Sequence, residues 1–325
     1  MKQLLFFITF LFAKAAFCQT TFVVDHFSPD YLGKVFIADT TQVFSEGWVA
    51  IFSKKSGEQI IKIDAEELTF ELHEGKVLAN IRELPYGEQS QILYEDYNFD
   101  SVKDFAIMDG QNSCYHGPSF QVYLATGRGF VHSPEFTRLS QEYCGMFAVD
   151  PDSKTIQTMT KSGCCWHQFS EFRVKDNKPY ATKIIEVGMG ESGITTDYEE
   201  QHLVDGKMVK SKYQVLAVEI GNDNLLLSFE FFNKKRMQIF VIEDRLHYAF
   251  TDADGKIELL HNDTFQYSAS QNLLTFTRQG TQYLIHDDKI IAQTPSRRYN
   301  MKAVNDTRLG TLAKLKTLKL ENLVK

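Results

Sequence analysis

The sequence predicts an all-β protein. Three observations support this: apolar runs are short and recur at even spacing, residues that favour strands are plentiful, and turn residues separate the runs. Among 325 residues there are 26 Phe and 14 Tyr but only 7 Pro, and aromatic and β-branched side chains suit pleated, half-buried surfaces. Because the pattern contains no long helical period, a sandwich, barrel or propeller is expected.

The first half of the chain reads as a series of short strands bounded by turn residues. Residues 68–72 and 155–160 alternate apolar and polar side chains, as strands with one buried face do. Gly127-Arg128-Gly129 predicts a tight turn. Candidate strands lie at residues 22–24, 35–37, 48–52, 60–63, 68–72, 105–108, 120–124 and 155–160.

A Gly-rich stretch at 188–193, followed by polar residues 195–200, predicts a loop or an internal boundary. Later residues Asp252–Gly255 and Arg278–Gly280 have hairpin-turn composition. Candidate strands lie at residues 214–220, 225–232, 238–242, 246–251, 273–277 and 282–285. Leucines recurring every third residue near the C-terminus predict either a short helix or a final strand pair; they are Leu309, Leu312, Leu315 and Leu318.

The N-terminus is typical of a secretory signal peptide. A lysine at position 2 precedes an apolar run at residues 4–12, and small residues follow. Cleavage after Cys18 would leave Gln19 as the first mature residue; lipidation of Cys18 is the alternative. We therefore expect a periplasmic or secreted protein with a signal peptide at 1–18, an N-terminal domain at 19–212 and a C-terminal β-rich region at 213–325.

Charge and hydropathy argue against nucleic-acid binding and against a transmembrane helix in the mature chain. The formal net charge is −7, and basic and acidic residues are mixed along the chain, so no basic stripe suggests nucleic-acid binding. The mature chain contains no apolar segment of the roughly 20 residues that a transmembrane helix needs.

Four cysteines remain after the signal peptide: Cys114, Cys144, Cys164 and Cys165. In an exported protein this number predicts two disulfides. The Cα atoms of neighbouring residues lie about 3.8 Å apart, below the usual disulfide range. We therefore expect Cys114 and Cys144 each to pair with one of the two neighbours.

The segment Asp96 to Asp104 predicts a calcium site. Side-chain oxygens fall at positions 1, 3, 5 and 9 of this loop, and calcium prefers six to eight oxygen ligands. The expected ligands are Asp96, Asn98, Asp100, the carbonyl of Val102 and Asp104. An EF-hand is not expected, because position 12 is Ile107 and a candidate strand follows where an EF-hand has a helix. The alternative is a solvated acidic turn.

Two short segments are candidate partner contacts. Tyr115 and His116 lie in a Gly/Pro loop beside Cys114, and Trp166 and His167 follow the Cys-Cys pair. Loops on a rigid scaffold often carry function. A thiol nucleophile with a histidine base is the catalytic alternative for the second segment, but four cysteines in an exported chain favour disulfides there.

Three segments together resemble a family of bacterial periplasmic proteins that includes an immunity lipoprotein inhibiting a lysozyme-like type IV secretion effector. They are Asp96–Asp104, residues 117–124 (GPSFQVYL) and residues 161–167 (KSGCCWH). The resemblance covers roughly residues 20–185. It implies a propeller-like β fold with bound Ca²⁺ on the Asp96–Asp104 ligands, and inhibition of a peptidoglycan hydrolase. The chain departs from the family in lacking a convincing lipobox and in its extra C-terminal region.

The sequence thus predicts an exported, non-catalytic binding protein whose partner is a lysozyme-like or other peptidoglycan hydrolase. No phosphate loop, serine-nucleophile elbow or HExxH motif is present in the sequence. The alternatives are a hydrolase of envelope polymers, which would need convergent carboxylates or an activated nucleophile in a pocket, and a structural surface module without an enzyme partner.

Overall fold

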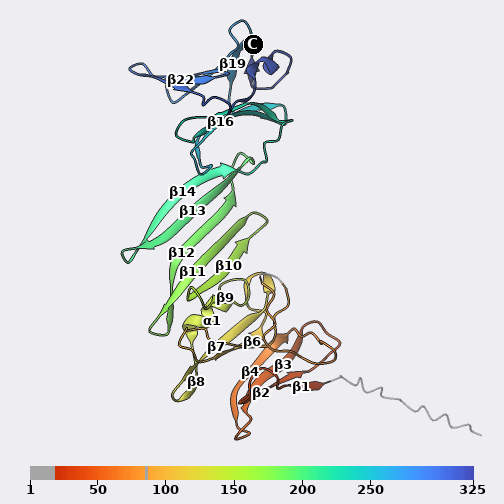
Figure 1. Cartoon of the computed structure of the whole chain (residues 1–325). Coiled ribbons are helices and arrows are strands. Elements are labelled where there is room, and N and C mark those ends of the chain that lie inside the picture. Colours follow the sequence, from red (N-terminus) through yellow and green to blue (C-terminus); the bar gives the residue numbers. More distant parts are fainter. Residues whose placement is uncertain (1–18, 85–86) are drawn as a thin grey trace, which may run out of the picture. The chain divides into compact units, whose positions relative to one another are not determined.

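The computed structural model describes residues 19–84 and 87–325, so the expected signal peptide at 1–18 lies outside the described residues (Figure 1). Almost every regular element in this part of the chain is a β-strand; one α-helix and two short 3₁₀ helices accompany them. The all-β prediction is therefore confirmed. None of the described helices is long and apolar enough to cross a membrane.

The chain divides into two compact units. The first holds the chain up to Gly163 together with His167–Ile184 and His202–Met208; the second holds Cys164–Trp166, Ile185–Gln201 and Val209–Lys325. The division runs through four long strands, and the expected boundary at residue 212 lies within the last of them.

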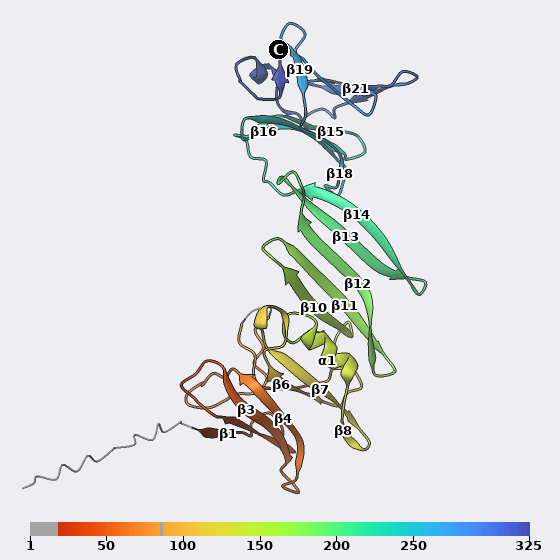
Figure 2. The ribbon, with the colours of Figure 1, turned by 180° about the vertical axis from the view of Figure 1, so that it is seen from behind.

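Two four-stranded antiparallel meanders build most of the first unit (Figure 2). Their alternating patterns direct one face inward; in the strand Gln59–Leu68 the apolar residues Ile61, Ile63 and Ala65 are buried and the side chains between them are exposed. The first sheet contains β1 (Thr20–Val24), β2 (Tyr31–Ile37), β3 (Ser45–Ser53) and β4 (Gln59–Leu68). The second contains β5 (Ile92–Glu95), β6 (Asp104–Gly110), β7 (Ser119–Thr126) and β8 (Gly129–His132). Meanders of this kind are the units of propeller blades, as expected of a propeller-like fold.

One α-helix, α1 (Pro134–Gln141), packs on β7 and was not expected from the sequence. Proline at its first position suits the helix start. The hydroxyl of Ser140 donates to the carbonyl of Phe120 at 2.6 Å, and the hydroxyl of Thr137 accepts from the N–H of Val122 at 3.0 Å. These two bonds satisfy backbone groups at the side of β7 and fix the helix against it. A short 3₁₀ helix, η1 (Cys114–His116), precedes β7.

A six-stranded sheet follows, in the order β14-β13-β12-β11-β10-β9. The polar stretch 195–200, expected to be a loop or boundary, belongs instead to strand β13, because its side chains lie half-buried on both faces. The bounds are β9 (Ala148–Asp150), β10 (Thr155–Ser162), β11 (Trp166–Lys175), β12 (Lys178–Met189), β13 (Thr195–Val204) and β14 (Lys207–Leu216).

Two further sheets form the second unit around a core that includes Leu227, Phe229, Tyr248 and Phe276. The turns predicted at Asp252–Gly255 and Arg278–Gly280 join consecutive hairpin strands, as expected. One sheet contains β15 (Leu225–Glu230), β16 (Arg236–Ile242), β17 (Arg245–Thr251), β18 (Ile257–His261) and β24 (Leu309–Gly310). The other contains β19 (Phe265–Ser268), β20 (Leu273–Arg278), β21 (Thr281–His286), β22 (Lys289–Gln293), β23 (Arg298–Lys302) and β25 (Leu323–Val324).

The C-terminal segment completes this unit. The three-residue leucine spacing produces a 3₁₀ helix, η2 (Leu312–Lys316), whose period is three residues. Leu312 and Leu315 are fully buried in the core. The side chain of Asn322 accepts from the N–H of Leu246 at 2.8 Å and donates to the Leu246 carbonyl at 2.9 Å, as a neighbouring strand would.

Two strand predictions were wrong. Residues 68–72 form no strand beyond Leu68, because β4 extends unbroken from Gln59 and ends there. Residues 217–220 lie outside the sheet: β14 starts earlier, at Lys207, and ends at Leu216. In both places the strand begins earlier in the sequence than predicted and ends before the predicted segment does.

Candidate metal and binding sites

The Asp-rich segment is a tight loop between β5 and β6. The carboxylate of Asp96 accepts hydrogen bonds from the N–H groups of Asp100 at 3.1 Å and Ser101 at 2.8 Å. Phe99 and Ser101 adopt left-handed backbone conformations, with φ of 62° and 74°. The carboxylate of Asp100 accepts from the N–H of Val102 at 2.8 Å. The aspartates therefore shape the loop by bonding its backbone amides.

Asp104, the last of the expected ligands, is fully buried at the start of β6. Its two oxygens accept from the N–H groups of Tyr97 and Ala125, each at 2.8 Å. Burial raises the pKa of Asp104 to about 6; these two bonds oppose the rise, and the nearby charges of Asp100 and Asp96 add to it. The loop thus places a buried carboxylate beside two more carboxylates.

The donor set suits a hard cation, because all the expected ligand atoms are oxygens. The carboxylates of the three aspartates do not, however, all lie within 4.8 Å of one another. In the part of the chain that the structure describes, the group that meets this criterion is Glu71, His73 and Glu88. Asn98 donates to Asp100 at 3.0 Å and to Asn177 at 3.1 Å. Calcium at this loop stays a prediction.

The cysteines form two disulfides, but the expected pairing was wrong. Cys114 bonds to Cys144, with Cα atoms 4.7 Å apart, and Cys164 bonds to its neighbour Cys165, with Cα atoms 3.8 Å apart. The N–H of Cys114 donates to the carbonyl of Tyr143 at 3.3 Å, which brings the first pair together. The second pair lies in the turn between β10 and β11, and the assumption that neighbouring cysteines are too close to bond does not hold there. Neither Cys165 nor its partner is a free nucleophile.

Tyr115 is held rigidly on the surface. Its side chain is 62 % exposed, its hydroxyl accepts from the N–H of Gly163, and the Lys161 ammonium lies 4.9 Å from its ring centre. A cavity of about 160 Å³ beside it is lined in part by Cys114, Cys144 and Lys161. The disulfide and these contacts fix an exposed aromatic ring, which is the usual form of a protein-binding anchor.

His116 lies next to Tyr115 but makes separate contacts. Its Nε2 atom lies 2.9 Å from a carboxylate oxygen of Glu67, and its ring lies 5.5 Å from that of Phe44. Both Phe44 and His116 are exposed, so they extend the aromatic surface around the loop.

The second predicted contact segment is less exposed. Trp166 is half-buried and lines a cavity of about 540 Å³ with Tyr198 and Tyr213. His167 is also half-buried, and its ring lies parallel to that of Phe169 at 6.3 Å. Neither residue projects in the way that Tyr115 does.

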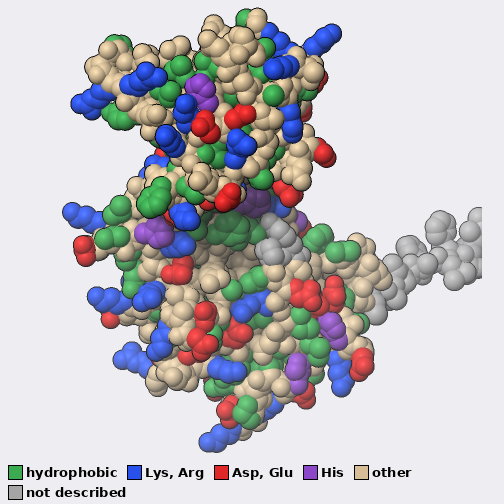
Figure 3. All heavy atoms as spheres, turned by 45° about the horizontal axis from the view of Figure 1, so that its top comes forward, with side chains coloured by type: hydrophobic (Ala, Val, Ile, Leu, Met, Phe, Trp, Pro, Cys, Tyr) green, Lys and Arg blue, Asp and Glu red, His purple; other side chains and the backbone are tan. Residues whose placement is uncertain are grey.

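A groove of about 900 Å³ in the second unit was not expected from the sequence. At its rim Phe232 is 95 % exposed and Tyr299 is 51 % exposed. Amide, acidic and basic side chains line it together with the aromatic rings; they include Asn233, Lys235, Phe250, Glu258, Tyr283 and Asn300. On the molecular face drawn in Figure 3, basic and acidic side chains are interspersed, in keeping with the mixed charge of the sequence.

Comparisons with known proteins find structural likenesses alone. No protein-family model matches the chain, and no curated protein matches it. A Xanthomonas type IV secretion system related protein is 17 % identical, covering 56 % of this chain and 90 % of its own, with a TM-score of 0.45. A putative 6-phosphogluconolactonase from Bacteroides uniformis is 7 % identical (89 % and 85 % coverage, TM-score 0.23), and prolyl oligopeptidase B from Galerina marginata is 8 % identical (86 % and 41 %, TM-score 0.24). At these scores none of them assigns an activity to this chain.

Proposed function

We propose that this chain is a calcium-stabilised, non-catalytic binding protein of the cell envelope that inhibits a peptidoglycan hydrolase. The observation that carries the proposal is the fixed, exposed ring of Tyr115 beside the Cys114–Cys144 disulfide. A ring that is already immobilised loses little conformational entropy when a partner covers it. The two disulfides fit an oxidising compartment outside the cytoplasm.

The class of partner comes from the sequence resemblance. The segments at 96–104, 117–124 and 161–167 resemble a family with a member that inhibits a lysozyme-like effector. In this chain Lys161 opens the third segment, and Cys114 and Tyr115 lie three and two residues before the start of the second. The candidate contact surface therefore lies beside the segments that carry the resemblance.

Calcium would have a structural role in this protein. The buried carboxylate of Asp104 lies near the carboxylates of Asp96 and Asp100, and a cation beside them would compensate this concentration of negative charge. The ion's ligands would be those two residues with Asn98, the Val102 carbonyl and Asp104. Its role is to fix the loop between β5 and β6.

The test is inhibition of purified lysozyme-like hydrolases acting on isolated peptidoglycan. The chain from residue 19 onward should abolish the activity of at least one such enzyme at stoichiometric concentration. Tyr115→Ala should weaken inhibition by about 30-fold, the effect of losing an anchor worth about 2 kcal/mol. Tyr180→Ala, which removes another exposed tyrosine of the first unit, is the matched control. Lack of inhibition across the panel, or equal effects of the two variants, would count against the proposal.

The groove of the second unit favours a second candidate function, binding of envelope glycan strands. Exposed aromatic faces such as Phe232 and Tyr299 offer apolar surface to sugar rings, and the amides beside them can bond hydroxyl groups. Co-sedimentation with insoluble peptidoglycan tests this directly. Phe232→Ala and Tyr299→Ala should reduce the bound fraction, whereas Phe169→Ala, an exposed aromatic elsewhere, should not; equal binding by all variants would exclude the groove.

A further inference from the structure

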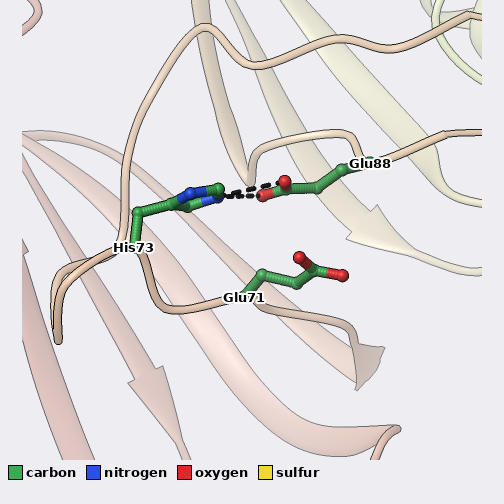
Figure 4. A group of neighbouring side chains, drawn as sticks. All are labelled: Glu71, His73 and Glu88. Atoms are coloured by element: carbon green, nitrogen blue, oxygen red, sulfur yellow. Dashed lines mark hydrogen bonds and ion pairs between the residues drawn. The ribbon is translucent and has the colours of Figure 1, made fainter.

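A cluster of side chains that could bind a metal lies in the first unit and includes no residue of the Asp-rich loop. The Nε2 atom of His73 lies 3.0 Å from each carboxylate oxygen of Glu88, and the Glu71 side chain extends alongside this contact (Figure 4). One ligand atom from each of the three lies within 4.8 Å of the others. The sequence places Glu71 and His73 two residues apart but gives no sign that Glu88 meets them.

Two turns position these side chains. The N–H of His73 donates to the carbonyl of Lys76 at 2.9 Å, and the N–H of Lys76 donates back at 3.0 Å. Glu74 and Gly75 between them adopt φ of 53° and 78°, as a tight two-residue hairpin turn requires. The carbonyl of Glu88 accepts from the N–H of Glu83 at 2.8 Å. Backbone hydrogen bonds therefore hold the chain at both sides of the cluster.

The charged groups that act on the imidazole of His73 are all carboxylates. The carboxylates of Glu88, Glu71 and Glu83 all lie close enough to the His73 imidazole to act on it electrostatically. Within residues 19–84 and 87–325, neither Glu71 nor Glu88 pairs with a lysine or arginine. The cluster thus holds more negative charge than its one histidine can balance, which favours a divalent cation.

We propose that Glu71, His73 and Glu88 bind a divalent transition-metal ion of the zinc class. An imidazole nitrogen with two carboxylates is a donor set that zinc accepts, and three protein ligands leave a position for water. Calcium fits poorly, because it prefers six to eight oxygen ligands and rarely an imidazole. The metal takes the place of the hydrogen bond between His73 and Glu88.

Such an ion would join two parts of the chain that are separated in sequence. It would tie the turn at residues 73–76 to Glu88, whose hydrogen bond with His73 now spans 15 residues. Because binding requires the folded arrangement of both turns, zinc would raise the unfolding temperature. None of its three ligands belongs to the proposed calcium loop, and Gly87 and Gln89, the chain neighbours of Glu88, line the cavity beside Tyr115.

The test is calorimetric titration of zinc chloride into the untagged chain from residue 19 onward, with excess calcium present to saturate any oxygen-only site. One zinc ion should bind per chain. His73→Gln and Glu88→Gln should each weaken binding by at least about tenfold, while circular dichroism reports that both remain folded. The imidazole nitrogen resonances of His73, assigned by comparison with His73→Gln, should shift as zinc is added.

The matched control is His116→Gln. His116 forms a comparable exposed pair with Glu67 at 2.9 Å but belongs to no three-residue ligand group in the described chain. The His116→Gln variant should bind zinc as tightly as the unaltered protein. Absence of zinc binding, or equal binding by His73→Gln and the unaltered chain, would overturn the proposal. Equal losses in His73→Gln and His116→Gln would also overturn it, since they would indicate unspecific binding to surface histidines.

Discussion

The carboxylate of Asp104 accepts a hydrogen bond from the backbone N–H of Ala125 at 2.8 Å, across 21 residues of sequence. Its other oxygen accepts from Tyr97 at the same distance. One buried side chain therefore fastens the Asp-rich loop to strand β7. The loop is thus part of the folded sheet and not an appendage of it.

Asp104→Asn should destabilise the first unit. An amide presents an N–H to at least one of the two backbone donors, and a buried donor without an acceptor costs about 1–3 kcal/mol. Urea unfolding of the variant should show a loss of this size. Asp152→Asn, in an exposed turn, should change stability by less than about 0.5 kcal/mol; a loss at Asp104 no larger than that would contradict the role given to this carboxylate.

Calcium should stabilise the protein through the same loop. We expect the unfolding temperature to rise with added calcium and to fall in chelator, since an ion that binds only the folded state shifts the equilibrium toward it. Asp100→Ala should abolish this difference, whereas Asp152→Ala should retain it. An unchanged calcium response in Asp100→Ala, measured by differential scanning calorimetry, would rule out the loop as the calcium site.

The two disulfides should differ greatly in their contribution to stability. Cys114–Cys144 closes a loop with a sequence separation of 30, and the chain-entropy estimate for such a loop is about 3–4 kcal/mol. Cys164–Cys165 joins neighbours and restricts the unfolded chain very little. The double variant Cys114→Ser/Cys144→Ser should lose far more unfolding free energy than Cys164→Ser/Cys165→Ser. Comparable losses in the two double variants would refute this ordering.

The second unit should lose stability in mild acid. His247 and His261 are each about 95 % buried, and burial lowers the pKa of both. The unfolded chain binds protons near pH 6.5, and the folded unit only at lower pH. The unfolding free energy of the second unit is therefore highest above about pH 6.5 and decreases as the pH falls below that value. Calorimetry between pH 7.5 and 5 should show this, and the double variant His247→Gln/His261→Gln should show a shallower slope; an equal slope would exclude these residues as the cause.

Gly47 should resist replacement by alanine. An added Cβ would lie 2.1 Å from the carbonyl oxygen of Phe36 on the paired strand β2, so the two strands would have to separate. Such overpacking costs about 1–3 kcal/mol. Gly127, where a Cβ would meet nothing within 4 Å, provides the control, and chemical denaturation of Gly47→Ala and Gly127→Ala in parallel measures the difference. Equal stabilities would show that the sheet adjusts freely.

Sequence patterns predicted those features that depend on local residue order. The strand alternation at 155–160 and the turns at Asp252 and Arg278 arise from neighbours in the chain. The leucine spacing left a helix and a strand pair equally open, and burial of Leu312 and Leu315 against the sheets decided it.

Features that depend on distant contacts were not predicted. Helix α1 is short, and its stability depends on distant contacts: Phe136 and Leu139 are buried in the core, and Thr137 and Ser140 bond the backbone of β7. The link of His73 to Glu88 crosses 15 residues and depends on two turns. The predicted disulfide pairing was wrong because the usual Cα–Cα distance does not apply to Cys164 and Cys165 in their turn. The groove at Phe232 is formed by strands that only folding brings together.

The C-terminal segment pairs with earlier strands of the second unit, and this determines when that unit can fold during synthesis. Strand β25 pairs in parallel with β19, β24 pairs with β15, and Asn322 bonds the backbone at Leu246. The second unit therefore cannot complete its core until residues 309–324 have been synthesised. A nascent chain that stalls before residue 309 would expose Leu227 and its apolar neighbours to proteases and chaperones.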